Sequence, residues 1–135
     1  MSNMSDDERI LDVSRETLDR LKLFEGLVQK WNPRINLVSR KSLTDLWNRH
    51  LVDSIQVFRT TRCTGHWIDL GSGGGFPGVV VAILAAEENP DLRVTLVESD
   101  QRKCAFLRTA IRETDIKCRV LSKRIEQVEP QEADI

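Results

Sequence analysis

The chain has 135 residues, of which 40% are apolar and 30% are charged, and its formal net charge at pH 7 is -1. This length suits a single hydrophobic core, and the near-zero net charge argues against a wholly basic nucleic-acid-binding protein. No apolar run approaches the ~20 residues of a membrane span, no secretion signal opens the chain, and the three cysteines lack the spacing of a metal site, so a cytoplasmic protein without membrane association or bound metal is expected.

Residues 1–62 are predicted to form an N-terminal helical subdomain. Ser5 and Glu8 have the spacing of a capping box, and the apolar residues after them lie on one face of a helix that Asn32-Pro33 would terminate. After a short extended piece, Ser42 is predicted to open a second helical segment with its own apolar face. The periodicity does not decide whether the first segment is one helix or two.

Basic residues gather in the second part of this subdomain. Six basic residues and two acids lie between Arg34 and Arg62. A local patch of this sign suits phosphate groups, although a solvated helix face explains it equally well. The candidates for phosphate contact are Arg34, Arg40, Lys41 and Arg49.

From residue 63 onward the pattern alternates between strands and helices. The predicted elements are a strand at 67–70, a helix at 78–88, a strand at 92–98, a helix after the N-cap Ser99 to about 113, and a strand at 117–121. This order favours parallel strands in a doubly wound α/β sheet. Residues 133–135 have the pattern of a fourth strand, so residues 63–135 are predicted to form the first half of such a sheet. Its unpaired edge would favour self-association.

The loop after the first strand carries two overlapping glycine patterns that suit different cofactors. Gly73-x-Gly75-x-x-Gly78 has the spacing of a dinucleotide-binding turn, and Glu98 follows where a ribose-binding acid belongs. Pro77 argues against this interpretation, because it removes a backbone amide from the turn that would meet the pyrophosphate. Dinucleotide binding and a loop without a cofactor remain as alternatives.

The other pattern is Gly71-x-Gly73-x-Gly75 directly after Asp69, which is typical of S-adenosylmethionine-dependent methyltransferases. A carboxylate at Asp69 suits a cofactor that carries a sulfonium and an ammonium group, whereas it would repel a pyrophosphate. Glycines let the backbone pass close to the cofactor, and Glu98 can accept hydrogen bonds from both ribose hydroxyls. The residues therefore favour S-adenosylmethionine.

Longer stretches of the chain resemble the glucose-inhibited division protein B family, the bacterial small-subunit rRNA methyltransferase G. They are Trp31–Leu37 with Arg49–Ser54, the loop ending in Phe76-Pro77-Gly78, and Glu98–Leu107 with Arg124-Ile125-Glu126. The resemblance implies a Rossmann-like class I methyltransferase that transfers a methyl group from S-adenosylmethionine to N7 of a guanine in the 530 loop of 16S rRNA. It also implies that 16S rRNA or the 30S subunit is the partner.

The same resemblance implies roles for individual residues. Gly71 and Phe76 would line the cofactor, Glu98 would bind its ribose, and Ile125 and Glu126 would frame its adenine. The family more often has Asp where Glu98 stands, a change of one methylene that keeps the hydrogen-bonding role. An arginine-bearing I-S-R-A segment of the family is absent from this chain. A truncated, non-catalytic binding module is therefore the alternative function.

Two polar residues of these stretches, Asn36 and His50, are candidates to face the cofactor or the RNA. Structural hydrogen bonding between the helical subdomain and the sheet is the alternative role for both. No catalytic acid or base is nominated, because guanine N7 has an unprotonated lone pair that can attack a methyl group without one.

Overall fold

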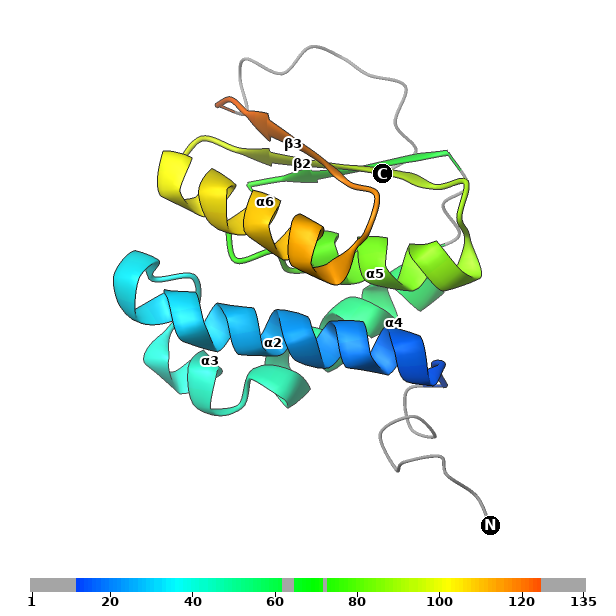
Figure 1. Cartoon of the computed structure of the whole chain (residues 1–135), viewed down its shortest axis with the longest axis horizontal. Coiled ribbons are helices and arrows are strands. Elements are labelled where there is room, and N and C mark those ends of the chain that lie inside the picture. The colour runs from blue at the N-terminus through cyan, green and yellow to red at the C-terminus, as the bar shows by residue number, and fades with distance from the viewer. Residues whose placement is uncertain (1–11, 62–64, 72, 125–135) are drawn as a thin grey trace.

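The computed structural model describes residues 12–61, 65–71 and 73–124, which form a parallel sheet, two helices on one of its faces and a layer of N-terminal helices outside those two (Figure 1). This arrangement confirms the predicted α/β class with a helical N-terminal part. The proposed capping box at Ser5 and Glu8 and the proposed fourth strand at 133–135 lie outside the described residues.

The first described helix, α2, spans Arg15–Ile35 and begins at the N-cap Ser14, whose side chain accepts a backbone hydrogen bond. The predicted end at Asn32-Pro33 is wrong, because Pro33 lies inside the last turn of the helix. The helix instead closes at Asn36, which adopts the left-handed conformation and donates its backbone N–H to the Asn32 carbonyl at 3.0 Å. A left-handed cap of this kind satisfies a carbonyl at the end of the helix.

The second helical segment is divided into three parts: α3 at Arg40–Thr44, a π-helical turn η1 at Trp47–Leu51, and α4 at Val52–Thr60. It begins earlier than predicted, because the N-cap is Ser39, whose hydroxyl accepts a hydrogen bond from the Ser42 backbone N–H at 3.1 Å. The π-helical turn is the larger departure from the prediction, and such turns are frequent at functional sites.

The strands and helices of the sheet region follow the predicted order. They are β1 at His66–Leu70, α5 at Gly78–Glu88, β2 at Arg93–Glu98, α6 at Gln101–Thr114 and β3 at Arg119–Ser122. The strand order is β1-β2-β3. Both pairings are parallel, which confirms the predicted direction of the strands. The N-cap of α6 is Asp100 rather than Ser99, because the Asp100 carboxylate accepts hydrogen bonds from the backbone N–H groups of Arg102 and Lys103.

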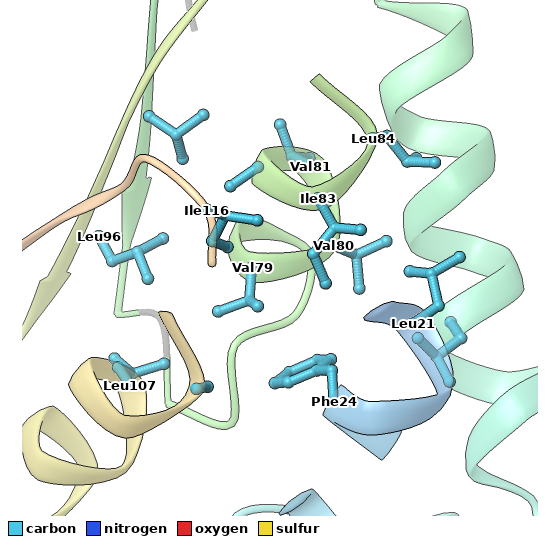
Figure 2. Packing of buried hydrophobic residues seen from close by; sticks show 14 of the residues in the cluster. Leu21, Phe24, Val79, Val80, Val81, Ile83, Leu84, Leu96, Leu107 and Ile116 are labelled. Atoms are coloured by element: carbon cyan, nitrogen blue, oxygen red, sulfur yellow. The ribbon is translucent and has the colours of Figure 1, made fainter. Parts of the chain in front are cut away.

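One hydrophobic core joins the N-terminal helices to the sheet. Figure 2 shows Leu21 and Phe24 of α2 pointing toward Val79 and Val80 of α5, and all four side chains are fully buried. Leu96 of β2 belongs to the same cluster. The core is thus continuous across the domain boundary that was predicted near residue 62.

The sheet is covered on one face only by the described helices. In Figure 1, α5 and α6 lie between the sheet and α2, and no described helix lies on the opposite face. Among the described strands, β1 pairs with β2 alone, so its other edge has no partner there. Self-association through this edge stays a prediction. The described helices also include none with the length and apolar character that crossing a membrane requires.

Gly78 is the residue at which α5 meets the sheet. A Cβ atom at this position would overlap the Leu96 side chain of β2 and the Asp69 carboxylate of β1. Gly26 in the middle of α2 offers the opposite case, because a Cβ atom there would have no neighbour within 4 Å.

We expect Gly78→Ala to lower the free energy of unfolding by about 1–3 kcal/mol, because the added methyl group forces the helix away from the sheet. Gly26→Ala, the matched control, should leave stability unchanged or raise it by up to about 1 kcal/mol through better helix propensity. Chemical denaturation of both variants measures the difference. Equal stability of the two variants would contradict the close approach at Gly78.

The Asp100 carboxylate at the start of α6 should make the stability of the fold depend on pH. The backbone N–H of Lys103, then that of Arg102, and the charges of both side chains lower the pKa of the Asp100 carboxyl below its ordinary 3.8. A group with a lowered folded-state pKa stabilises the fold above its unfolded pKa and loses this contribution as the pH falls through the folded-state value. The chain should therefore lose stability on acidification below about pH 4, and Asp100→Asn should lose less. Equal losses in denaturation curves at neutral and acidic pH would contradict this role.

Candidate functional site

The turn after β1 has the backbone shape that its glycines allow. Gly71, Gly73 and Gly75 have φ angles of 72°, 50° and 91°, in the left-handed region where other residues are strained. The Gly71 N–H donates to the Val97 carbonyl at 2.8 Å, which continues the pairing of β1 with β2 by one residue. The predicted start of the turn at Gly71 therefore agrees with the structure.

The glycines of the turn face different surroundings. A Cβ atom at Gly74 would lie 3.0 Å from the Leu37 carbonyl oxygen, and one at Gly75 would lie 2.8 Å from the Phe24 ring. Among the described residues, a Cβ atom at Gly73 would meet only a backbone oxygen at 3.9 Å. The N-terminal helical layer thus packs closely on the second half of the turn, whereas no described side chain packs on Gly73.

Glu98, at the end of β2, binds the turn at Gly73. Its Oε1 accepts the Gly73 N–H at 2.7 Å and its Oε2 accepts the Asp100 N–H at 3.0 Å, and the residue is only 8% exposed. A carboxylate offers about four acceptor positions, so two remain after these contacts. The Glu98 side chain therefore holds the turn, and its contact with the ribose hydroxyls of a cofactor stays a prediction.

Asp69 has a structural role in addition to the one predicted for it. Its Oδ2 accepts the backbone N–H of Gly78 at 3.0 Å. This places a negative charge at the N-terminus of α5, where it interacts favourably with the positive end of the helix dipole. The preceding residue, Pro77, makes no side-chain cap there. Asp69 thus compensates for the missing cap, and its contact with a cofactor stays a prediction.

Phe76 places the glycine turn after β1 in contact with two N-terminal elements. Its ring centroid lies 5.2 Å from that of Phe24 and 5.0 Å from that of His50 in the π-helical turn. The Nε2 atom of His50 is buried, and no described residue makes a hydrogen bond with it. The structure therefore packs His50 against the turn, and its predicted contact with RNA stays untested.

The predicted basic patch is spread over separate surfaces. Arg34 lines a groove between α2 and α6, whereas Arg40 lines a second groove beside the end of α2, together with Asn36. Lys41 is exposed on α3. Arg49 lies 3.9 Å from the Asp45 carboxylate, an exposed pair of small energetic weight. The two remaining predicted site residues, Ile125 and Glu126, lie outside the described residues.

The sequence did not reveal which residues support the turn. Phe24 and Leu37 hold Gly75 and Gly74, yet periodicity places Phe24 only in the core and gives Leu37 no role. The adjacent glycines were the one available signal, because consecutive residues without a Cβ atom indicate that something packs closely on them. No metal site is evident, since the part of the chain that the structure describes contains no cluster of three or more His, Cys, Asp or Glu side chains that could hold an ion.

The geometry defines the class of protein. A parallel sheet, a left-handed glycine turn after its first strand and a carboxylate at the end of the second strand make a Rossmann-like fold of the methyltransferase type. The sequence model of the rRNA small subunit methyltransferase G family matches residues 17–135, and the chain belongs to this family.

Individual relatives agree with this assignment and share the name ribosomal RNA small subunit methyltransferase G. The relative from Ruegeria pomeroyi is 62% identical over 132 residues, which cover 98% of this chain and 65% of the relative. Those from Sinorhizobium fredii and Paramagnetospirillum magneticum are 54% and 52% identical and are covered over 59% and 58% of their lengths. The chain thus spans about six-tenths of the curated relatives that it matches.

The hold of Glu98 on the turn can be measured directly. Glu98→Gln removes the charge and leaves one acceptor oxygen for two backbone N–H groups, so the amide protons of Gly73 or Asp100 should exchange about 10-fold faster with solvent. Hydrogen exchange followed by NMR reports each amide separately. Glu87→Gln removes the same charge from an exposed position of α5 and should leave both rates unchanged. Unchanged rates in Glu98→Gln would show that the carboxylate does not hold the turn.

Proposed function

We propose that this chain binds S-adenosylmethionine and belongs to an enzyme that methylates N7 of a guanine in the 530 loop of 16S rRNA. The observation that carries the proposal is the hydrogen bond from the Gly73 N–H to the Glu98 carboxylate, which links the glycine turn after β1 to the end of β2. Membership of the rRNA small subunit methyltransferase G family supports the rRNA substrate. An enzyme with this substrate would act in the cytoplasm on 16S rRNA or on the 30S subunit.

The start of α5 supports a sulfonium cofactor over a dinucleotide. In a dinucleotide-binding turn, the free N–H groups at the helix N-terminus receive the pyrophosphate. Here the Asp69 carboxylate already accepts the Gly78 N–H, and Pro77 has no N–H to offer. A pyrophosphate would therefore meet a negative charge in place of free donors, whereas a positively charged cofactor would be attracted.

The chemistry requires placement more than proton transfer. When bound, S-adenosylmethionine would supply a methyl group on a positively charged sulfur. The lone pair of guanine N7 forms the new N–C bond while the S–C bond breaks, so the sulfur leaves as a neutral thioether and the positive charge passes to the base. No proton moves in this step, so no general base is nominated. The residues of the chain would contribute by orientation: Glu98 fixes the ribose, and the backbone at Gly73 shapes the adjacent surface.

Calorimetry tests cofactor binding. The chain should bind S-adenosylmethionine and not a nicotinamide dinucleotide. Glu98→Ala should weaken binding by about 10- to 100-fold, because hydrogen bonds to a charged group are worth about 1.5–3 kcal/mol each. Glu87→Ala is the matched control and should bind as the unaltered chain does. Binding that is insensitive to Glu98→Ala would remove the proposed ribose contact.

The position of methylation is tested separately by mass spectrometry of 16S rRNA nucleosides, after incubation of 30S subunits with the protein and cofactor. N7-methylguanosine is the expected product. A methyl group on another atom of guanine would contradict the proposed attack by N7. Cofactor binding without any methylated nucleoside would favour the alternative of a non-catalytic binding module.

A further inference from the structure

A groove of about 550 Å³ runs between the end of α2 and the beginning of α6. The residues that line it are Lys30, Trp31, Arg34, Ile35, Arg102 and Ala105. Sequence patterns do not group these residues, because Arg102 has the spacing of a solvated helix face and Trp31 that of a core residue. The fold brings cations from two separate helices into one groove with an aromatic side chain.

The cations of this groove are available to a ligand. Lys30, Arg34 and Arg102 are all exposed, and none of them forms an ion pair within the described ranges of the chain. Lys30 and Arg34 are one helical turn apart on α2, and like charges at this spacing repel each other. The Asp100 carboxylate interacts electrostatically with Arg102, but it already caps α6. A bound anion would relieve this concentration of positive charge.

Trp31 gives the groove an aromatic surface. Its ring meets the Phe106 ring edge-on, with centroids 5.7 Å apart and an interplanar angle of 61°. The Trp31 side chain is only partly buried, whereas Phe106 is fully buried. Part of the indole is therefore accessible from the groove. A partly exposed aromatic ring in a groove lined by cations is the arrangement on which proteins stack the bases of single-stranded nucleic acids.

The groove lies at the same end of the molecule as the glycine turn after β1. Figure 1 shows that α2 ends and α6 begins on the side at which the three strands end. Arg102 lies in the first turn of α6, four residues after Glu98. A chain of nucleotides bound along the groove would therefore lead toward the glycine turn at Gly73.

We propose that this groove binds single-stranded RNA, with phosphates on Lys30, Arg34 and Arg102 and one base stacked on Trp31. The identity of the ligand rests on the proposed function, while the location rests on the groove itself. Duplex RNA fits less well, because its bases are stacked on each other and cannot reach an indole ring. The target would thus be an unpaired segment of the RNA next to the methylated base.

Fluorescence anisotropy with a labelled single-stranded RNA, without cofactor, tests the groove independently of methyl transfer. Each single-strand phosphate contact contributes about 0.7 to the slope of log K against log salt, so the triple variant Lys30→Gln, Arg34→Gln, Arg102→Gln should flatten the slope by about 2. Arg108→Gln removes one charge from an exposed position of α6 outside the groove, and it should leave the slope unchanged. A triple variant with the unaltered slope, or an unaltered chain that does not bind the RNA, would overturn the proposal.

The stacking is tested at Trp31. Trp31→Leu should weaken binding of the single strand about 10-fold, Trp31→Phe should retain most of it, and neither should change binding of a duplex of the same sequence. Equal losses for single strand and duplex, or no loss in Trp31→Leu, would overturn the stacked base. Circular dichroism checks that the variants fold. Calorimetry with S-adenosylmethionine on the same variants should give the affinity of the unaltered chain, so failure of the groove is distinguishable from failure of the cofactor site.

Discussion

The glycine turn after β1 is held between the sheet and the N-terminal helical layer, and the candidate site depends on this close packing. The Phe24 ring and the Leu37 carbonyl occupy the space that side chains at Gly75 and Gly74 would need. On the sheet side, Glu98 accepts the Gly73 N–H. The turn is therefore fixed from both sides. The N-terminal helices are therefore part of the site and not an appendage to it.

A row of ring contacts extends this packing from the turn to the groove. His50 meets Phe76, Phe76 meets Phe24, and Phe24 meets Phe106, with centroid distances of 5.0, 5.2 and 6.2 Å. Phe106 in turn contacts Trp31 at 5.7 Å. Aromatic pairs at such distances add stabilisation beyond the burial of their area. The row thus connects the glycine turn to the groove between α2 and α6 through one set of packed rings.

Local patterns predicted the sheet region well, because each signal there acts between near neighbours. The predicted helix at 78–88 matches α5, and the glycine pattern located the turn. The errors lay at helix ends. The Asp100 side chain caps α6 in place of Ser99, and α2 ends beyond Pro33, where the backbone of Asn36 adopts the left-handed conformation. Contacts between residues far apart in the sequence, such as Phe24 with Gly75, have no local signal at all. The groove between α2 and α6 could not be predicted from the sequence for the same reason.

The positions of the acidic residues near the ends of the strands explain how a chain of net charge -1 presents a positively charged groove. Asp69, Glu98 and Asp100 each accept backbone N–H groups of a turn or a helix start. Their negative charge is thus partly offset by backbone dipoles and used within the fold. The cations of the groove have no such partners among the described residues. Affinity for a polyanion depends on the charges near its path more than on the total, so a nearly neutral chain can bind RNA at one place without attracting it everywhere.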